Sequence, residues 1–249
     1  MLNCITIWLS VSYDSENETY KYMKDYNIND PWDWVTRFED EVANYTGYRY
    51  GIACDSNSNA IRLCLHYLNI TDTDIEIPAN TYVSVPNQII LSGNRPQFRD
   101  IKWKWLYPIG DTGIIDAATA FYESMGRGYE DKFMILSFHL KKILNIGQGG
   151  MILTNRDDFN EWARPMIYDG RHKDRLYKED EFECVGWHMY MSPESAKKGL
   201  EIFNSEKINR WLPAHKVFCL VYITIYLHFT YKRAKFYCQK TLFITKNIL

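Results

Sequence analysis

The sequence predicts an α/β domain with a mainly parallel sheet flanked by helices. Short apolar segments of strand length alternate with amphipathic segments of helical length between residues 34 and 155, a pattern typical of strand–helix–strand units. Two of the apolar segments end in a small polar residue, Asp116 and Ser137. Because ligands gather at the carboxyl ends of parallel strands, these residues are the first candidates for a functional site.

The first half of the chain supplies alternating helices and strands. The segment PWDWVTRFEDEVANYTG (31–47) places Trp34, Phe38, Val42 and Tyr45 at helical spacing and stops at Gly47. YRYGIAC follows as a β-type run, and DSNSN is a polar turn that opens the next helix. A strand then begins with DIEIP, a helix runs through Ile89 to Leu91, and a strand follows at Gln97–Ile101.

The second half contributes three further strands and a helix. GIIDAATAF predicts a buried strand ending at Asp116, KFMILSFHL one ending near Ser137, and GGMILTN a third. The last predicted helix begins with Ser192 as N-cap and Pro193 in its first turn. We assign residues 1–30 to an N-terminal arm, 31–206 to the large domain, and 207–249 to an atypical tail that is basic and apolar and contains no Asp or Glu.

Composition excludes several classes of partner. The 29 basic and 31 acidic residues give a formal net charge of -2, so neither nucleic acid nor a membrane is predicted as a partner. The six cysteines form no C-x-x-C pair and have no histidine spacing suited to zinc, and we therefore predict no metal site. The opening MLNCITIWLS lacks a basic region and a cleavage site, which favours a cytoplasmic protein with reduced thiols.

Each polar candidate also has an ordinary explanation. Asp116 could cap the helix that follows it, Ser137 could be a turn residue, and Lys142 could be a solvated lysine beside Lys141. The turn at residues 55–59 could cap a helix and bind nothing. Their order along the chain favours a shared role.

The sequence resembles the DegT/DnrJ/EryC1/StrS family of sugar aminotransferases, which belong to the fold-type I aminotransferases. The resemblance rests on a polar helix-opening turn, then NTY, then IIDAATAF, and then SFHLKK followed by GQGG, and it runs from about Trp34 to about Trp211. In the family, the lysine that carries pyridoxal phosphate lies five residues after the serine of Ser-Phe-His, which identifies Lys142. Gly147, Gly149 and Gly150 match the family's glycines.

The resemblance implies roles for the other site residues. Asp116 would hold the protonated ring nitrogen of pyridoxal phosphate, and Ser137 would contact its phosphate. Asn57 and Ser58 match the family's phosphate-binding turn, in which we expect Asn57 to adopt a left-handed backbone. Tyr82 would stack on the cofactor ring, and Thr119 stands where the family has a glutamine that contacts the phenolic oxygen.

The implied function is transfer of an amino group, from glutamate by family analogy, to a keto group of a nucleotide-linked sugar, by a homodimer. Two segments depart from the family. The family spends several tens of residues on the stretch between Asp100 and Asp116, where this chain has only IKWKWLYPIGDTGII, so a sheet element is expected to be missing. The C-terminal small domain is expected to be reduced or missing. His188 and Tyr190 replace an asparagine and an arginine of a segment that reaches the neighbouring subunit. The alternatives are a non-catalytic or regulatory protein that keeps the cofactor fold, and a plain α/β domain that binds neither cofactor nor substrate.

Overall fold

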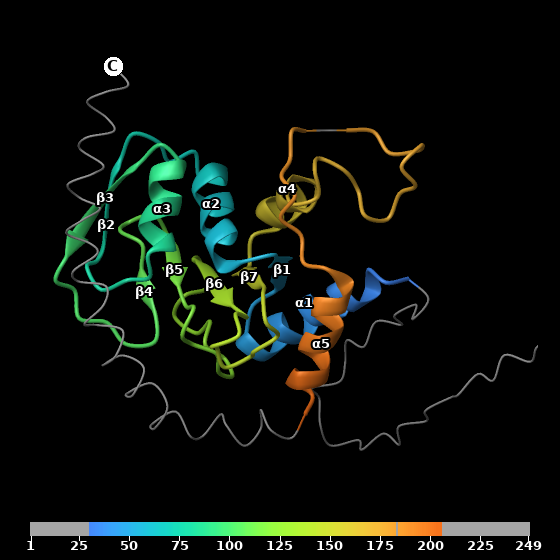
Figure 1. The fold of residues 1–249 in the computed structure, drawn as a ribbon, viewed down its shortest axis with the longest axis horizontal. Coiled ribbons are helices and arrows are strands. Elements are labelled where there is room, and N and C mark those ends of the chain that lie inside the picture. Colours follow the sequence, from blue (N-terminus) through green and yellow to red (C-terminus); the bar gives the residue numbers. More distant parts are fainter. Residues whose placement is uncertain (1–29, 183, 206–249) are drawn as a thin grey trace, which may run out of the picture.

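The computed structural model describes residues 30–182 and 184–205, in which helices and strands alternate as far as β3 and four further strands and two helices follow (Figure 1). The predicted arm, apart from Asp30, and the whole of the predicted tail lie outside these residues. In chain order the elements are α1 (Asp33–Thr46), β1 (Tyr50–Cys54), α2 (Asn57–Tyr67), β2 (Asp74–Pro78), α3 (Ser84–Leu91), β3 (Arg95–Arg99), β4 (Tyr107–Pro108), β5 (Ile114–Asp116), β6 (Phe133–Ser137), β7 (Gly150–Thr154), α4 (Asp157–Met166) and α5 (Pro193–Phe203).

The sheet is mixed rather than mainly parallel, which corrects that part of the prediction. Its five strands lie in the order β1-β7-β6-β5-β4. Only β5 and β6 pair in parallel, while β1 with β7, β6 with β7, and β4 with β5 pair antiparallel. The connection between β6 and β7, residues 138–149, contains no helix, whereas parallel neighbours are usually joined by a crossover helix.

A separate two-stranded sheet holds β2 and β3, which pair in parallel around the crossover helix α3. Strand β3 begins at Arg95, two residues earlier than predicted, and it includes Pro96. Proline removes a hydrogen-bond donor, so it is tolerated on an edge strand, which is the position of β3 in a sheet of two.

The core has two halves, one on each face of the large sheet. Along each strand alternate side chains point to opposite faces, and the helices cover both faces (Figure 1). One face packs against α1 and α5 through Ala53, Ile115, Met134, Leu136, Met151 and Leu153. The other packs against α2, α3 and α4 through Ile52, Ile114, Phe133, Ile135 and Ile152.

The predicted helix ends agree with the structure. Gly47 closes α1 in the left-handed conformation, with φ of 84°, which glycine adopts without steric cost. Ser192 caps α5 by accepting a hydrogen bond from the amide of Ser195, and Pro193 is the first helical residue. Helix α4 is an addition that the sequence analysis did not assign. Within the described residues, no helix has the length and apolar character needed to cross a membrane.

Candidate active site

Four of the predicted site residues come from the carboxyl ends of β5 and β6 and from the start of α2, namely Asp116, Ser137, Asn57 and Ser58. Asp116 is the last residue of β5, and Ser137 is the last residue of β6. Because these two strands are parallel neighbours, both residues lie at the same edge of the sheet. Asn57 reaches this edge from α2 and donates from Nδ2 to Asp116 Oδ1 at 3.3 Å and to the carbonyl of Ile135 at 3.3 Å.

The carboxylate of Asp116 is buried and accepts three hydrogen bonds. Asp116 is only 5% exposed. Besides Asn57, the backbone amide of Ala118 donates to Oδ1 at 3.0 Å. The hydroxyl of Tyr107 donates to Oδ2 at 2.6 Å. A buried carboxylate needs such donors to remain charged.

Tyr107 is a site residue that the sequence analysis missed. It lies in β4, directly opposite Asp116 in the antiparallel ladder, and its hydroxyl also contacts the hydroxyl of Thr81. Burial and the nearby charge of Asp116 raise the pKa of Tyr107 well above its usual value. Tyr107 therefore stays protonated and donates its hydrogen to Asp116. A strand of two residues has no periodicity that a sequence analysis could detect.

Lys142 lies in the loop that joins β6 to β7. Backbone hydrogen bonds from Phe138 to Gly149 at 2.9 Å and from Leu140 to Gly147 at 3.0 Å close this loop. The amide of Lys142 donates to the carbonyl of His139 at 2.8 Å. The two lysines therefore lie at the tip of a hydrogen-bonded reversal, with Lys141 exposed and Lys142 partly buried.

Lys142, Ser137 and Thr119 line one small cavity. Its volume of about 10 Å³ has room for roughly one water molecule. The hydroxyl of Thr119 donates to the carbonyl of Trp105 at 2.7 Å. The cavity thus brings the three predicted residues together. Ala118 also lines the cavity, and its amide donates to Asp116, so Asp116 lies next to the same site.

Two glycines of the predicted run are required by packing. A Cβ atom at Gly150 would lie 2.4 Å from the amide nitrogen of Asn57, so no side chain fits between β7 and the start of α2. Gly149 has φ of 152°, and a Cβ there would lie 2.8 Å from Met191. These glycines allow the loop of Lys142 to leave β6 and return against the first turn of α2.

The start of α2 differs from the prediction in one respect. Asn57 is the first helical residue, is absent from the described residues with positive φ, and points its side chain at Asp116. It therefore does not adopt the predicted left-handed turn. Ser56 is the N-cap and accepts from the amide of Asn59 at 3.2 Å. The first amides of a helix have no carbonyl partner within it, so this end remains suited to an anion.

Asp55 lies beside this helix start. Its carboxylate accepts from Nδ2 of Asn59 at 2.9 Å and from the hydroxyl of Ser56 at 3.0 Å. Burial raises the pKa of Asp55, and these two hydrogen bonds and the nearby His188 partly offset the effect. A negative charge next to a potential anion site is electrostatically unfavourable.

The remaining predicted residues lie at the margin. Tyr82 is 54% exposed in the loop between β2 and α3, directly after the buried Thr81. His188 pairs with Asp169, with 2.8 Å between Nδ1 and Oδ2. The ring of Tyr190 packs on Trp32 and Tyr168 at centroid distances of 5.3 and 5.0 Å, so it belongs to a packed aromatic cluster before α5.

The donor set fits pyridoxal phosphate. The described residues supply an amine, a buried carboxylate for a ring nitrogen, a hydroxyl at Ser137, and a helix start for a phosphate. They form one wall of a site and do not enclose a chamber of cofactor size, since the cavity beside Lys142 holds about one water.

Comparison with known proteins gives a family match. The model of the DegT/DnrJ/EryC1/StrS aminotransferase family matches residues 14–108 and 112–226. The match extends beyond both ends of the predicted resemblance, and its one break lies in the stretch predicted to be shortened. GDP-perosamine synthase of Caulobacter vibrioides is 25% identical over 224 residues, covering 74% of this chain and 59% of that protein.

A second relative and a solved structure show similar coverage. The UDP-2-acetamido-2-deoxy-3-oxo-D-glucuronate aminotransferase of Pseudomonas aeruginosa is 26% identical over 185 residues, covering 57% of this chain and 51% of that protein. NtdA of Bacillus subtilis, solved with bound cofactor PMP, superposes with a TM-score of 0.57 at 21% identity, covering 68% of this chain and 47% of that one. The chain thus spans between half and three-fifths of the length of the two curated relatives, the GDP-perosamine synthase and the UDP-sugar aminotransferase.

Proposed function

Because the chain belongs to the DegT/DnrJ/EryC1/StrS aminotransferase family, we propose that it is a pyridoxal-phosphate-dependent aminotransferase. The observation that carries the proposal is the convergence of Lys142 and Ser137 on one cavity next to the buried carboxylate of Asp116. We also propose that the amino acceptor is a keto group of a nucleotide-linked sugar, because two relatives are named for reactions on such sugars.

Each residue has a distinct role in this proposal. When bound, pyridoxal phosphate supplies an aldehyde that accepts the amino group and a ring that stabilises negative charge at the donor's α-carbon. The amine of Lys142 would anchor the cofactor and would then move a proton to and from that carbon. Asp116 holds the proton of the ring nitrogen, and a charge-assisted hydrogen bond in a buried site is a strong one.

The phosphate and the ring are held by the surrounding elements. Ser137, Ser58 and the first amides of α2 bind the phosphate anion. Asn57 contributes by fixing Asp116, to which it donates a hydrogen bond. Thr119 would contact the ring's phenolic oxygen, and Tyr82 would stack on a face of the ring. We assign glutamate as the amino donor on the family resemblance.

We propose a cytoplasmic homodimer. The buried cysteines Cys54 and Cys64 are free thiols, which fits a reducing compartment. The described residues form only one wall of the site, which fits a second subunit that completes it. Size measurement by light scattering tests this assembly, and full activity in a monomer contradicts it.

The adjacent lysines allow a matched test of the activity. Protein purified with pyridoxal phosphate is compared with the Lys142→Ala and Lys141→Ala variants by absorption spectroscopy, before and after addition of glutamate. We expect a visible band of lysine-bound cofactor that persists in Lys141→Ala, is lost in Lys142→Ala, and shifts with glutamate. A lysine-dependent band that glutamate does not shift favours a non-catalytic cofactor-binding protein. Absence of the band in the unmodified protein contradicts both the aminotransferase and the non-catalytic cofactor-binding protein.

A further inference from the structure

The segment between β3 and β5 joins the two sheets at the candidate site. The indole of Trp103 donates to Oδ1 of Asn80 at 2.7 Å, and the amide of Gly110 donates to the carbonyl of Glu76 at 2.8 Å. The hydroxyl contact between Tyr107 and Thr81 lies between these two links. All three contacts run from the short segment to β2 or to the loop after it.

The central link continues to Asp116. Tyr107 has one hydroxyl hydrogen, and the charged oxygen Oδ2 of Asp116 at 2.6 Å is a stronger acceptor than a neutral hydroxyl. Thr81 must then donate to the oxygen of Tyr107. The result is a directed chain of hydrogen bonds from Thr81 through Tyr107 to Asp116, and such chains reinforce one another in a buried site.

All three members of the chain are buried. Thr81 is 4% exposed, Tyr107 3% and Asp116 5%. The ring of Tyr107 is held from the side by Trp103 at a centroid distance of 4.8 Å. Water therefore cannot readily replace a lost hydroxyl in this chain, so its removal leaves buried polar atoms without a partner.

From this geometry we infer that Tyr107 is a positioning residue that couples Asp116 to the loop carrying Tyr82. The inference deepens the proposed function and rests on it for the roles of Asp116 and Tyr82. Tyr82 follows Thr81 directly, so the hydroxyl of Tyr107 fixes both the carboxylate at the ring nitrogen and the backbone next to the residue that covers the ring. The short segment supplies this link because it places β4 directly beside β5.

The test combines hydrogen exchange with cofactor binding in the full chain. The Tyr107→Phe variant removes one hydroxyl and keeps the ring. Tyr48→Phe is a matched control, because Tyr48 is 4% exposed and its hydroxyl donates at 3.0 Å to the carbonyl of Tyr129, away from the site. Thr81→Val breaks the other half of the chain and leaves Asp116 with its donor.

We expect Tyr107→Phe to speed amide exchange in residues 79–85 by roughly tenfold, while Tyr48→Phe leaves that segment unchanged. Thr81→Val should speed exchange in that segment to a similar extent. Adding Thr81→Val to Tyr107→Phe should speed exchange little further, because both substitutions break the same chain of hydrogen bonds. Pyridoxal phosphate should bind Tyr107→Phe several-fold more weakly than Tyr48→Phe.

The outcomes separate this inference from the proposed function. Unchanged exchange in residues 79–85 in both Tyr107→Phe and Thr81→Val overturns the coupling, whether or not cofactor binds. Faster exchange with unchanged cofactor affinity overturns the positioning role. If the unmodified protein binds no pyridoxal phosphate, the proposed function fails, and the exchange measurement still decides whether Tyr107 couples the two segments.

Discussion

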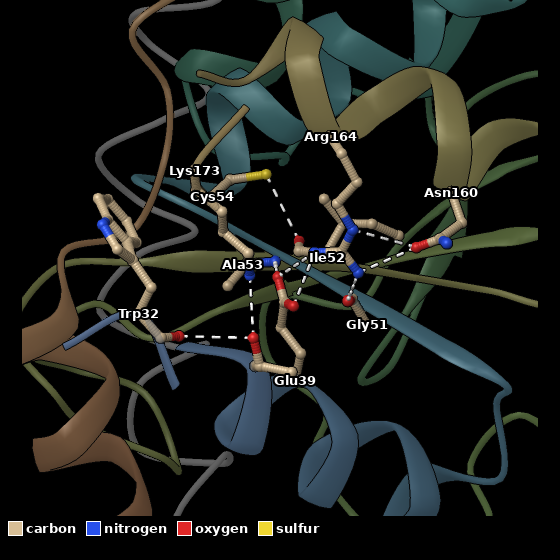
Figure 2. A network of polar contacts seen from close by, with 10 residues as sticks. Trp32, Glu39, Gly51, Ile52, Ala53, Cys54, Asn160, Arg164 and Lys173 are labelled. Atoms are coloured by element: carbon tan, nitrogen blue, oxygen red, sulfur yellow. Dashed lines mark hydrogen bonds and ion pairs between the residues drawn. The ribbon is translucent and has the colours of Figure 1, made fainter. Parts of the chain in front are cut away.

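Arg164 and the buried Glu39 form a partly buried ion pair that ties two helices to the first strand of the sheet (Figure 2). Nη1 of Arg164 lies 2.7 Å from both carboxylate oxygens of Glu39. Glu39 Oε1 also accepts from the amide of Ala53 at 2.7 Å, and Nη2 of Arg164 donates to the carbonyl of Gly51 at 3.1 Å. The pair therefore fixes α1 and α4 against β1, which leads directly into the start of α2.

Replacing Arg164 with leucine should destabilise the protein strongly. Glu39 is 3% exposed, and loss of its partner leaves a buried charge, which typically lowers the free energy of unfolding by about 3 kcal/mol or more. The control is Arg49→Leu, since Arg49 pairs with Asp157 on the surface and should contribute less than about 1 kcal/mol. Urea unfolding measures both, and equal losses would contradict the structural role of Glu39.

Gly150→Ala should damage both the fold and the site. The added Cβ would lie 2.4 Å from the amide nitrogen of Asn57, so β7 and the start of α2 must separate. Gly93→Ala is the comparison, because Gly93 has φ of 76° but no atom near the added Cβ. Gly93→Ala should lose only about 1 kcal/mol of stability, because its sole cost is the strain of a left-handed backbone. We expect Gly150→Ala to lose more stability and also to lose pyridoxal phosphate binding, which absorbance titration measures.

Local chemistry explains which features the sequence could predict. Gly47 and the pair Ser192 and Pro193 act through their own backbone geometry, so the helix ends they set agree with the structure. Asp116 and Ser137 end buried apolar runs, which placed them at the edge of the sheet. These signals lie within a few residues of the features that they determine.

The missed features depend on contacts between distant segments. Strand direction has no local signal, so the antiparallel pairing of β1 with β7 could not be predicted. Tyr107 contacts Asp116 only because a two-residue strand pairs with β5. An asparagine in a polar turn often adopts a left-handed backbone. Asn57 instead begins a helix and donates a hydrogen bond to Asp116, which lies 59 positions away in the sequence.

Asp116→Asn should separate cofactor attachment from catalysis. The variant keeps the shape of the side chain and loses the charge that holds the proton of the ring nitrogen. We expect Lys142 still to bind the cofactor, while the spectral change with glutamate slows by at least about 100-fold. The exposed Asp111 provides the control variant Asp111→Asn, which should react at the unmodified rate. Stopped-flow absorbance measures this step, and an unchanged rate in Asp116→Asn would refute the assigned role.

Asp55→Asn should strengthen binding of pyridoxal phosphate at neutral pH. The carboxylate of Asp55 lies at the start of α2, where the phosphate is proposed to bind, and its charge repels the phosphate. Asparagine has a similar shape and keeps an oxygen that can accept from Asn59. We expect the dissociation constant of the cofactor to fall several-fold, as measured by fluorescence titration.

The pH dependence of this difference follows from the raised pKa of Asp55. Burial places that pKa above the ordinary value of 3.8, so the carboxyl is charged above the raised pKa and neutral below it. The advantage of Asp55→Asn should therefore be complete above the raised pKa of Asp55 and should disappear as the pH falls through it. Asp72→Asn, at an exposed position beside Arg95, should bind like the unmodified protein at every pH. An advantage that stays constant as the pH falls would show that Asp55 acts through packing rather than through its charge.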